Sequence, residues 1–201
     1  MNAGWMKALK PTVFCAALLP LAYFLWRIFV SQRGIESTGY LINHTGAWSM
    51  YLLCIGLAVT PARKLFAWPW LARLRGMLGL FAFFYVCLHV FIVSWLEHDF
   101  DPALVWHHLS RTSANVMDAI AFFLLIPLAL TSNQATKRLL GGARWKRLHS
   151  MVYVIVPLAA ARFWAGALTS GQWGETIAFG IIIATLLGIR LYWWIRQPQY
   201  A

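Results

Sequence analysis

The chain has 201 residues, of which 61% are hydrophobic and 11% are charged. Because a soluble domain usually carries about 25% charged residues, this composition excludes an ordinary soluble protein and indicates an integral membrane protein. The formal net charge of +11 does not indicate a nucleic-acid partner. The basic residues lie in short segments between apolar runs, where they act as topology signals.

Six apolar runs are each close to the ~20 residues that a helix needs to cross ~30 Å of hydrocarbon. The sequence therefore predicts an all-α integral membrane protein, a six-transmembrane-helix bundle in a single domain over residues 1–201. The first run is long for a signal-peptide core and has no clear cleavage site of small residues, so we expect it to remain as a span. The expected spans are residues 11–30, 44–61, 77–96, 113–131, 148–168 and 175–195.

Prolines and polar segments mark the expected bends and ends of these spans. Pro20 and Pro127 are expected to bend the first and fourth spans, where neighbouring helices can bond the freed carbonyls. Thr60-Pro61 is expected to end the second span. The longest connection, residues 97–112, is expected to be a loop.

The basic residues are distributed asymmetrically between the two ends of the expected bundle. Positive residues accumulate on the cytoplasmic side of membrane proteins, so this asymmetry predicts that both termini are cytoplasmic. The chain is therefore expected to cross the membrane several times. Of the 17 basic residues, the predicted cytoplasmic ones are Lys7, Lys10, Arg63, Lys64, Arg73, Arg75, Lys137, Arg138, Arg144, Lys146, Arg147 and Arg196.

Two histidines lie inside membrane-length runs. His89 is 13 residues beyond Gly76, roughly 20 Å into the membrane at 1.5 Å per residue, whereas His149 is only about 5 Å inside its span. Titratable residues within a span are costly and usually mark a site. Haem b is held by imidazoles from facing helices, and the absence of a CxxCH motif from the sequence excludes c-type attachment. The different depths predict two haem sites, with His89 and His149 as iron ligands.

Each of these histidines also has a structural interpretation. His89 would then be a core residue bonded to a neighbour, and His149 an interfacial residue beside a basic cluster. His44, expected at the outer end of the second span, either caps that helix or ligates the outer haem. His98, His107 and His108 are expected to be solvated, because a metal site there needs a third convergent ligand that the sequence does not identify.

Five segments together resemble the MsrQ (YedZ) family, which belongs to the ferric-reductase-like transmembrane group. The resemblance covers nearly the whole chain in the same order and at similar spacing. The segments are RWKRLHSMVY at 144–153, LRGMLGLFAFFYVCLH at 74–89, TGAWSMYLL at 45–53, TPARKL at 60–65 and IPLALTSN at 126–133.

The resemblance implies a haem b subunit of the bacterial inner membrane that takes electrons from the quinol pool and passes them to MsrP, a periplasmic molybdopterin enzyme. That enzyme reduces methionine sulfoxide in damaged proteins. Flavin mononucleotide (FMN) is also attributed to the family. His89 and His149 match two of its haem histidines. The chain itself would be an electron-transfer subunit, with no catalytic residue of its own.

The sequence departs from the family where a third histidine is expected, 13 residues after His149. That position is Arg162, whose guanidinium has no lone pair for iron but could pair with a haem propionate. By depth, Arg162 is level with His89. The outer haem then takes His44 as its second ligand, is five-coordinate, or is missing.

Two other functions are compatible with the sequence. The first is a stand-alone transmembrane ferric or cupric reductase, with the outer histidines as the metal-docking site. The second is a haem-free transporter of small solutes. No glycine-rich dinucleotide-binding unit is present in the sequence. Electrons for the MsrQ-like relay or for a stand-alone reductase must therefore come from a membrane quinol or a separate reductase.

Overall fold

The computed structural model describes residues 3–29, 38–171 and 173–196. Helices dominate these ranges, and none of the described residues forms a β-strand. The six long helices are α1 (Ala3–Phe29), α2 (Thr38–Leu65), α3 (Ala72–Leu96), α5 (Ser113–Leu130), α8 (Val152–Ser170) and α9 (Gly174–Arg196). The short ones are the 3₁₀ helix η2 (Pro69–Leu71), α4 (Pro102–Arg111), α6 (Gln134–Leu140) and α7 (Gly142–His149).

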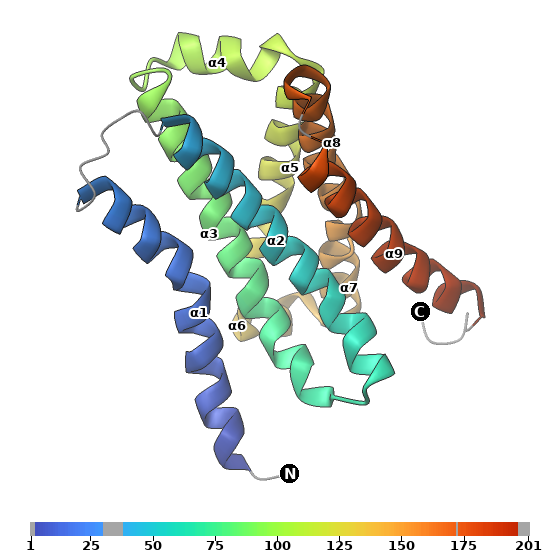
Figure 1. Cartoon of the computed structure of the whole chain (residues 1–201). Helices are drawn as coiled ribbons and strands as arrows, with labels where there is room; N and C mark the ends of the chain where they lie inside the picture. Colours follow the sequence, from blue (N-terminus) through green and yellow to red (C-terminus); the bar gives the residue numbers. More distant parts are fainter. Residues whose placement is uncertain (1–2, 30–37, 172, 197–201) are drawn as a thin grey trace.

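Six stretches of these helices are long and apolar enough to cross a membrane, which confirms the predicted number of spans. The last residue of the first expected span, residue 30, lies outside the described residues. Figure 1 shows α2 and α3 side by side, with α1 along one side of this pair. The helix α4 and the turn between α8 and α9 lie at one end of the bundle, and α6 lies at the other.

The core forms where α2 and α3 meet α5, α8 and α9. Its most deeply buried side chains include Met50 and Leu57 of α2, Tyr85 of α3, and Ile155 and Val156 of α8, each at most 2% exposed. By contrast, many apolar side chains point away from the bundle, as expected for a surface that faces lipid.

The bend in α1 is stabilised by a side chain from α3. Pro20 has no backbone N–H to donate, and the backbone N–H of the next residue, Leu21, donates to the Tyr85 hydroxyl at 3.2 Å. The Tyr85 hydroxyl in turn donates to the Ala17 carbonyl at 2.8 Å. The phenol thus contacts two backbone groups of α1 beside Pro20 and fixes α1 against α3, since a buried backbone group without a partner is costly in lipid.

The helix α2 continues through Pro61 to Leu65, so the prediction that Thr60-Pro61 ends the span is wrong. Proline at position 61 frees the carbonyl of Leu57, four residues earlier. Arg190 of α9 donates to that carbonyl from Nη2 at 2.6 Å. Because this donor replaces the missing N–H, the helix can continue.

Two expected boundaries differ from the structure for identifiable reasons. Residues 102–111 of the expected outer loop form α4, which starts at Pro102 with the Asp101 carboxylate accepting from Ala103 N. Proline at the first position and aspartate at the cap are standard helix-start residues. The expected fifth span is divided into α7 and α8, because the chain turns at Ser150 and Met151.

The fold makes the predicted topology testable, because α4 and α6 lie at opposite ends of the bundle (Figure 1). We expect reporter fusions at Arg138 and at Ala201, which lies outside the described residues, to report cytoplasm. A fusion at Pro102 should report periplasm. Alkaline phosphatase and fluorescent-protein activities measure this, and the reverse pattern at any of the three would overturn the assigned orientation.

Candidate functional site

His149 ends α7 and faces a cavity with one ring nitrogen free. Its Nδ1 lies 3.2 Å from the Trp145 carbonyl, to which it donates in the neutral tautomer, and its ring stacks on the Trp145 indole at a centroid distance of 4.0 Å. Its Nε2 is buried without a hydrogen-bond partner. An imidazole held in this way by its other nitrogen is oriented as a metal-ligating histidine is.

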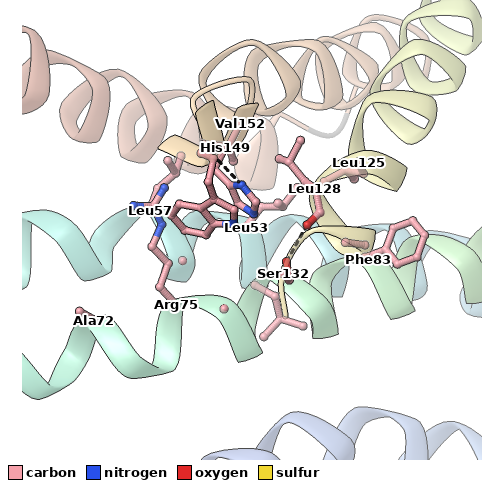
Figure 2. Close-up of a pocket in the computed structure, with 16 residues that line it drawn as sticks. Leu53, Leu57, Ala72, Arg75, Phe83, Leu125, Leu128, Ser132, His149 and Val152 are labelled. Carbon is pink, nitrogen blue, oxygen red and sulfur yellow. Dashed lines mark hydrogen bonds between the residues drawn. The ribbon is translucent and has the colours of Figure 1, made fainter. Parts of the chain in front are cut away.

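The cavity next to His149 lies between α2, α3, the end of α5 and the α7–α8 junction (Figure 2). Its volume is about 130 Å³, below the usual range of ~300–1,000 Å³ for cofactor sites, so a cofactor bound here would also occupy space that is open to the outside. Gly56, Gly76 and Gly79 line it, and a Cβ at any of the three would meet nothing within 4 Å. The glycines therefore widen the space between α2 and α3.

Few polar groups line this cavity. Arg75 extends toward it from α3, and Ser132 donates from Oγ to the Leu128 carbonyl at 2.6 Å. That carbonyl also faces the His149 imidazole. Among the described lining residues, His149 supplies the one imidazole and Arg75 the one cation. An apolar pocket with one imidazole and one guanidinium suits an apolar ring system that carries a metal and carboxylates.

His89 lies in a polar network formed by α2, α3, α5 and α8. Its Nδ1 is 3.0 Å from the Ile42 carbonyl and 3.2 Å from Thr45 Oγ1. Since the Thr45 hydroxyl donates to the Leu41 carbonyl at 2.7 Å, its oxygen is left to accept. These contacts place the imidazole proton on Nδ1 and leave Nε2 as the acceptor.

Arg162 occupies the acceptor nitrogen of His89. Its Nη1 is 3.2 Å from His89 Nε2 and donates to Asp118 Oδ2 at 2.8 Å. The expectation that position 162 is level with His89 is confirmed. In this arrangement, the nitrogen that would ligate iron already accepts a hydrogen bond, and Arg162 pairs with Asp118 of α5. We did not predict this carboxylate, although an aspartate in an apolar run requires a partner.

His44 lies in the second turn of α2 rather than at its start. Its Nδ1 is 3.0 Å from the Tyr40 carbonyl, and its ring stacks on Tyr40 at 3.7 Å. The neighbouring residues Thr45 and Gly46 face His89. Successive residues are about 100° apart around a helix. The structure thus places His44 beside Tyr40 and brings His89 to Arg162 instead.

The outer histidines are not equivalent. His107 is exposed, as expected, but His98 and His108 are partly buried and lie beside Glu97. Burial, followed by the proximity of His98, lowers the pKa of His108, so its imidazole is neutral near pH 7. Glu97 is the third convergent group that the sequence did not identify, because α4 folds back over the end of α3.

Comparison with known proteins gives the chain a family. Residues 45–160 match the family model described as ferric reductase like transmembrane component. The protein-methionine-sulfoxide reductase heme-binding subunit MsrQ of Herminiimonas arsenicoxydans is 40% identical over 195 residues, which cover 96% of this chain and 89% of the relative.

Further relatives agree. The MsrQ subunit of Polaromonas naphthalenivorans is 38% identical over 199 residues, covering 94% and 91% of the two chains. That of Bordetella pertussis is 36% identical over 198 residues, covering 98% and 96%. No solved structure matches. The chain, with its six spans and its identity to these subunits along nearly the whole length, belongs to the MsrQ family of ferric-reductase-like transmembrane proteins.

Proposed function

We propose that the chain is a haem b subunit of the bacterial inner membrane that relays electrons from quinol to MsrP, a periplasmic molybdopterin reductase that repairs oxidised methionine. The observation that carries this function is the buried Nε2 of His149, which faces an apolar cavity without a partner. The names of the relatives, which call them heme-binding subunits of a protein-methionine-sulfoxide reductase, support it.

The residues around the cavity fit a haem b group. His149 would supply a nitrogen ligand and Arg75 would face the propionates, while the three glycines keep part of the cavity wall free of side chains. Bound there, haem would supply one-electron redox chemistry. Trp145 fixes the ring of His149 from one side, and its indole N–H donates to the Thr131 carbonyl at 2.9 Å, which anchors α7 to the end of α5. The apolar walls exclude water and thereby favour the less charged reduced state.

Position 89 fits haem less well. His89 would have to exchange the hydrogen bond from Arg162 for iron, and Arg162 would have to leave Asp118 for a propionate. We therefore propose one haem, on His149, and assign His89, Arg162 and Asp118 to a polar cluster on the outer side. His44, which contacts Tyr40, is assigned a structural role.

The remaining partners are proposed from the family resemblance. Quinol is the donor and FMN a further cofactor. The exposed basic residues of α7, Arg144, Lys146 and Arg147, lie beside the cavity and suit a flavin phosphate or lipid headgroups. Electron balance holds, since oxidation of one quinol releases two electrons and two protons. Reduction of one sulfoxide to a thioether and water consumes the same number.

The relay itself can be tested in proteoliposomes. We expect a quinol to reduce the haem, and purified MsrP with methionine sulfoxide to reoxidise it, as followed by the absorbance of the reduced b-type band. Omission of either MsrP or the sulfoxide should leave the haem reduced. Rapid reoxidation by ferric chelates without MsrP, with no response to MsrP, would instead favour a stand-alone metal reductase.

The ligand assignment predicts the effect of two substitutions. His149→Ala should weaken haem binding by more than the ~10-fold typical for loss of an outer-shell partner, because it removes the axial nitrogen itself. Gly79→Leu should fold, since a Cβ there meets nothing within 4 Å, but should fill the cavity and lower haem content. Haem per protein, measured as the pyridine haemochrome, checks both.

Two matched variants serve as controls for this experiment. His107→Ala removes an exposed histidine, and Gly188→Leu enlarges a glycine that lies outside the cavity lining. Both should bind haem as the natural protein does. Unchanged haem content in His149→Ala would refute the assignment.

The outer cluster gives a prediction of the opposite sign. Arg162→His should raise haem per protein, with new six-coordinate low-spin signals in electron paramagnetic resonance, because a second imidazole then faces His89. The substitution is combined with Asp118→Asn, because Arg162→His alone would leave the Asp118 carboxylate without its ion-pair partner. Arg138→His, on the exposed face of α6, is the control. If haem content and spectrum stay unchanged, His89 is not accessible to a haem.

A further inference from the structure

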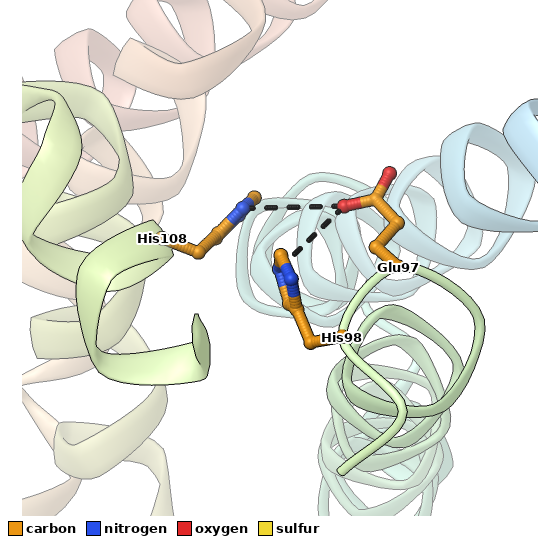
Figure 3. Close-up of side chains that lie close together, drawn as sticks. All are labelled: Glu97, His98 and His108. Atoms are coloured by element: carbon orange, nitrogen blue, oxygen red, sulfur yellow. Dashed lines mark ion pairs between the residues drawn. The ribbon is translucent and has the colours of Figure 1, made fainter. Parts of the chain in front are cut away.

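Three potential metal ligands converge on the outer side of the bundle. Glu97 and His98 lie in the turn that follows α3, and α4 places His108 beside them (Figure 3). Glu97 Oε2 is 3.9 Å from both His98 Nε2 and His108 Nδ1. One ligand atom from each of the three lies within 4.8 Å of the others.

His98 is the member whose bonding is incomplete. Its side chain is 15% exposed, and its Nε2 is buried without a hydrogen-bond partner. A buried polar atom without a partner is costly, so native proteins rarely contain one unless a ligand, a water or an ion bonds to it. A cation between His98, His108 and Glu97 would use this nitrogen.

The connection between α3 and α4 holds the three groups in place. Asp99 and Phe100 adopt left-handed conformations with φ of 46° and 58°, which are strained for a bulky residue such as phenylalanine. The backbone N–H of Phe100 donates to the Ser94 carbonyl at 2.8 Å, and that of Asp101 donates to the His98 carbonyl at 2.7 Å. At the other end of α4, Asn115 donates from Nδ2 to the His108 carbonyl at 2.6 Å.

The chemistry of the three groups selects the cation. Two imidazoles and one carboxylate form the set that binds Zn(II) in sites with an open fourth position, whereas Ca(II) and Mg(II) prefer oxygen ligands. A tetrahedral Zn(II) with bonds of about 2.0–2.1 Å holds its ligand atoms ~3.3 Å apart, so the side chains need to approach by roughly 1 Å.

We propose that Glu97, His98 and His108 form a binding site for a divalent transition-metal cation of the Zn(II) class. The local charge favours it, because residues 97–101 contain three of the six acidic residues of the chain, Glu97, Asp99 and Asp101. The cation clips α4 to the end of α3 and adds positive charge near Arg162, which is close enough to act on His108. None of these ligands belongs to the His149 cavity.

The test is a Zn(II) titration of the full-length protein, purified with a histidine-free tag and stripped with a chelator. The natural protein should bind one equivalent. His98→Ala and His108→Ala should bind at least 10-fold more weakly, and Glu97→Gln, which keeps the shape of the side chain, should also lose affinity. His107→Ala is the matched control, because it removes the exposed neighbour on the same helix.

Two further measurements separate this site from folding and from haem. Circular dichroism verifies that each variant is folded, and Zn(II) should raise the Tm of the natural protein but not that of His98→Ala. The titration is repeated in His149→Ala, where one equivalent should still bind even if haem is lost. If Zn(II) does not bind, or if His107→Ala weakens binding as much as His98→Ala, there is no such site.

Discussion

Inside a bilayer, a polar group must find its partner within the protein, because no water is available to bond it. This constraint explains the contacts that hold the bundle together. The Tyr85 hydroxyl bonds two backbone groups of α1 beside Pro20, and Arg190 bonds the carbonyl that Pro61 frees. Arg162 and Asp118 bring two opposite charges together between α8 and α5.

Against this background, a buried nitrogen without a partner indicates a site. His149 and His89 are both intramembrane histidines with Nδ1 bonded to a backbone carbonyl, but they differ at Nε2. The Nε2 of His149 faces a cavity, whereas that of His89 accepts from Arg162. The two histidines therefore have different proposed roles, His149 as a haem ligand and His89 as part of a polar cluster. The difference arises because α8 places Arg162 against the Nε2 of His89, whereas the Nε2 of His149 has no such neighbour.

The sequence predicted what depends on length and depth along a helix. The six spans follow from the lengths of the apolar runs, and the shared depth of His89 and Arg162 follows from counting residues from the predicted membrane boundary. These quantities need no knowledge of how the helices are rotated.

Features that depend on rotation or on chain reversal could not be predicted in this way. Whether His44 faces His89 depends on the orientation of α2 about its axis, and the pairing of Asp118 with Arg162 depends on two such rotations. Glu97 and His108 are separated by 11 positions in sequence and meet because α4 folds back over the end of α3. The sequence did contain a helix-start signal for α4, Asp101 followed by Pro102, but two residues alone do not distinguish a helix from a turn.

The bond between Arg190 and the Leu57 carbonyl makes the effects of substitutions at positions 61 and 190 depend on each other. Replacing Pro61 alone would restore a backbone N–H that competes for the carbonyl and leave the guanidinium short of an acceptor. Replacing Arg190 alone would leave the carbonyl unbonded at the wall of the His149 cavity, which Leu57 lines. Changing both together restores an ordinary helical hydrogen bond and removes the buried guanidinium, so the effects of the two substitutions on stability should not be additive.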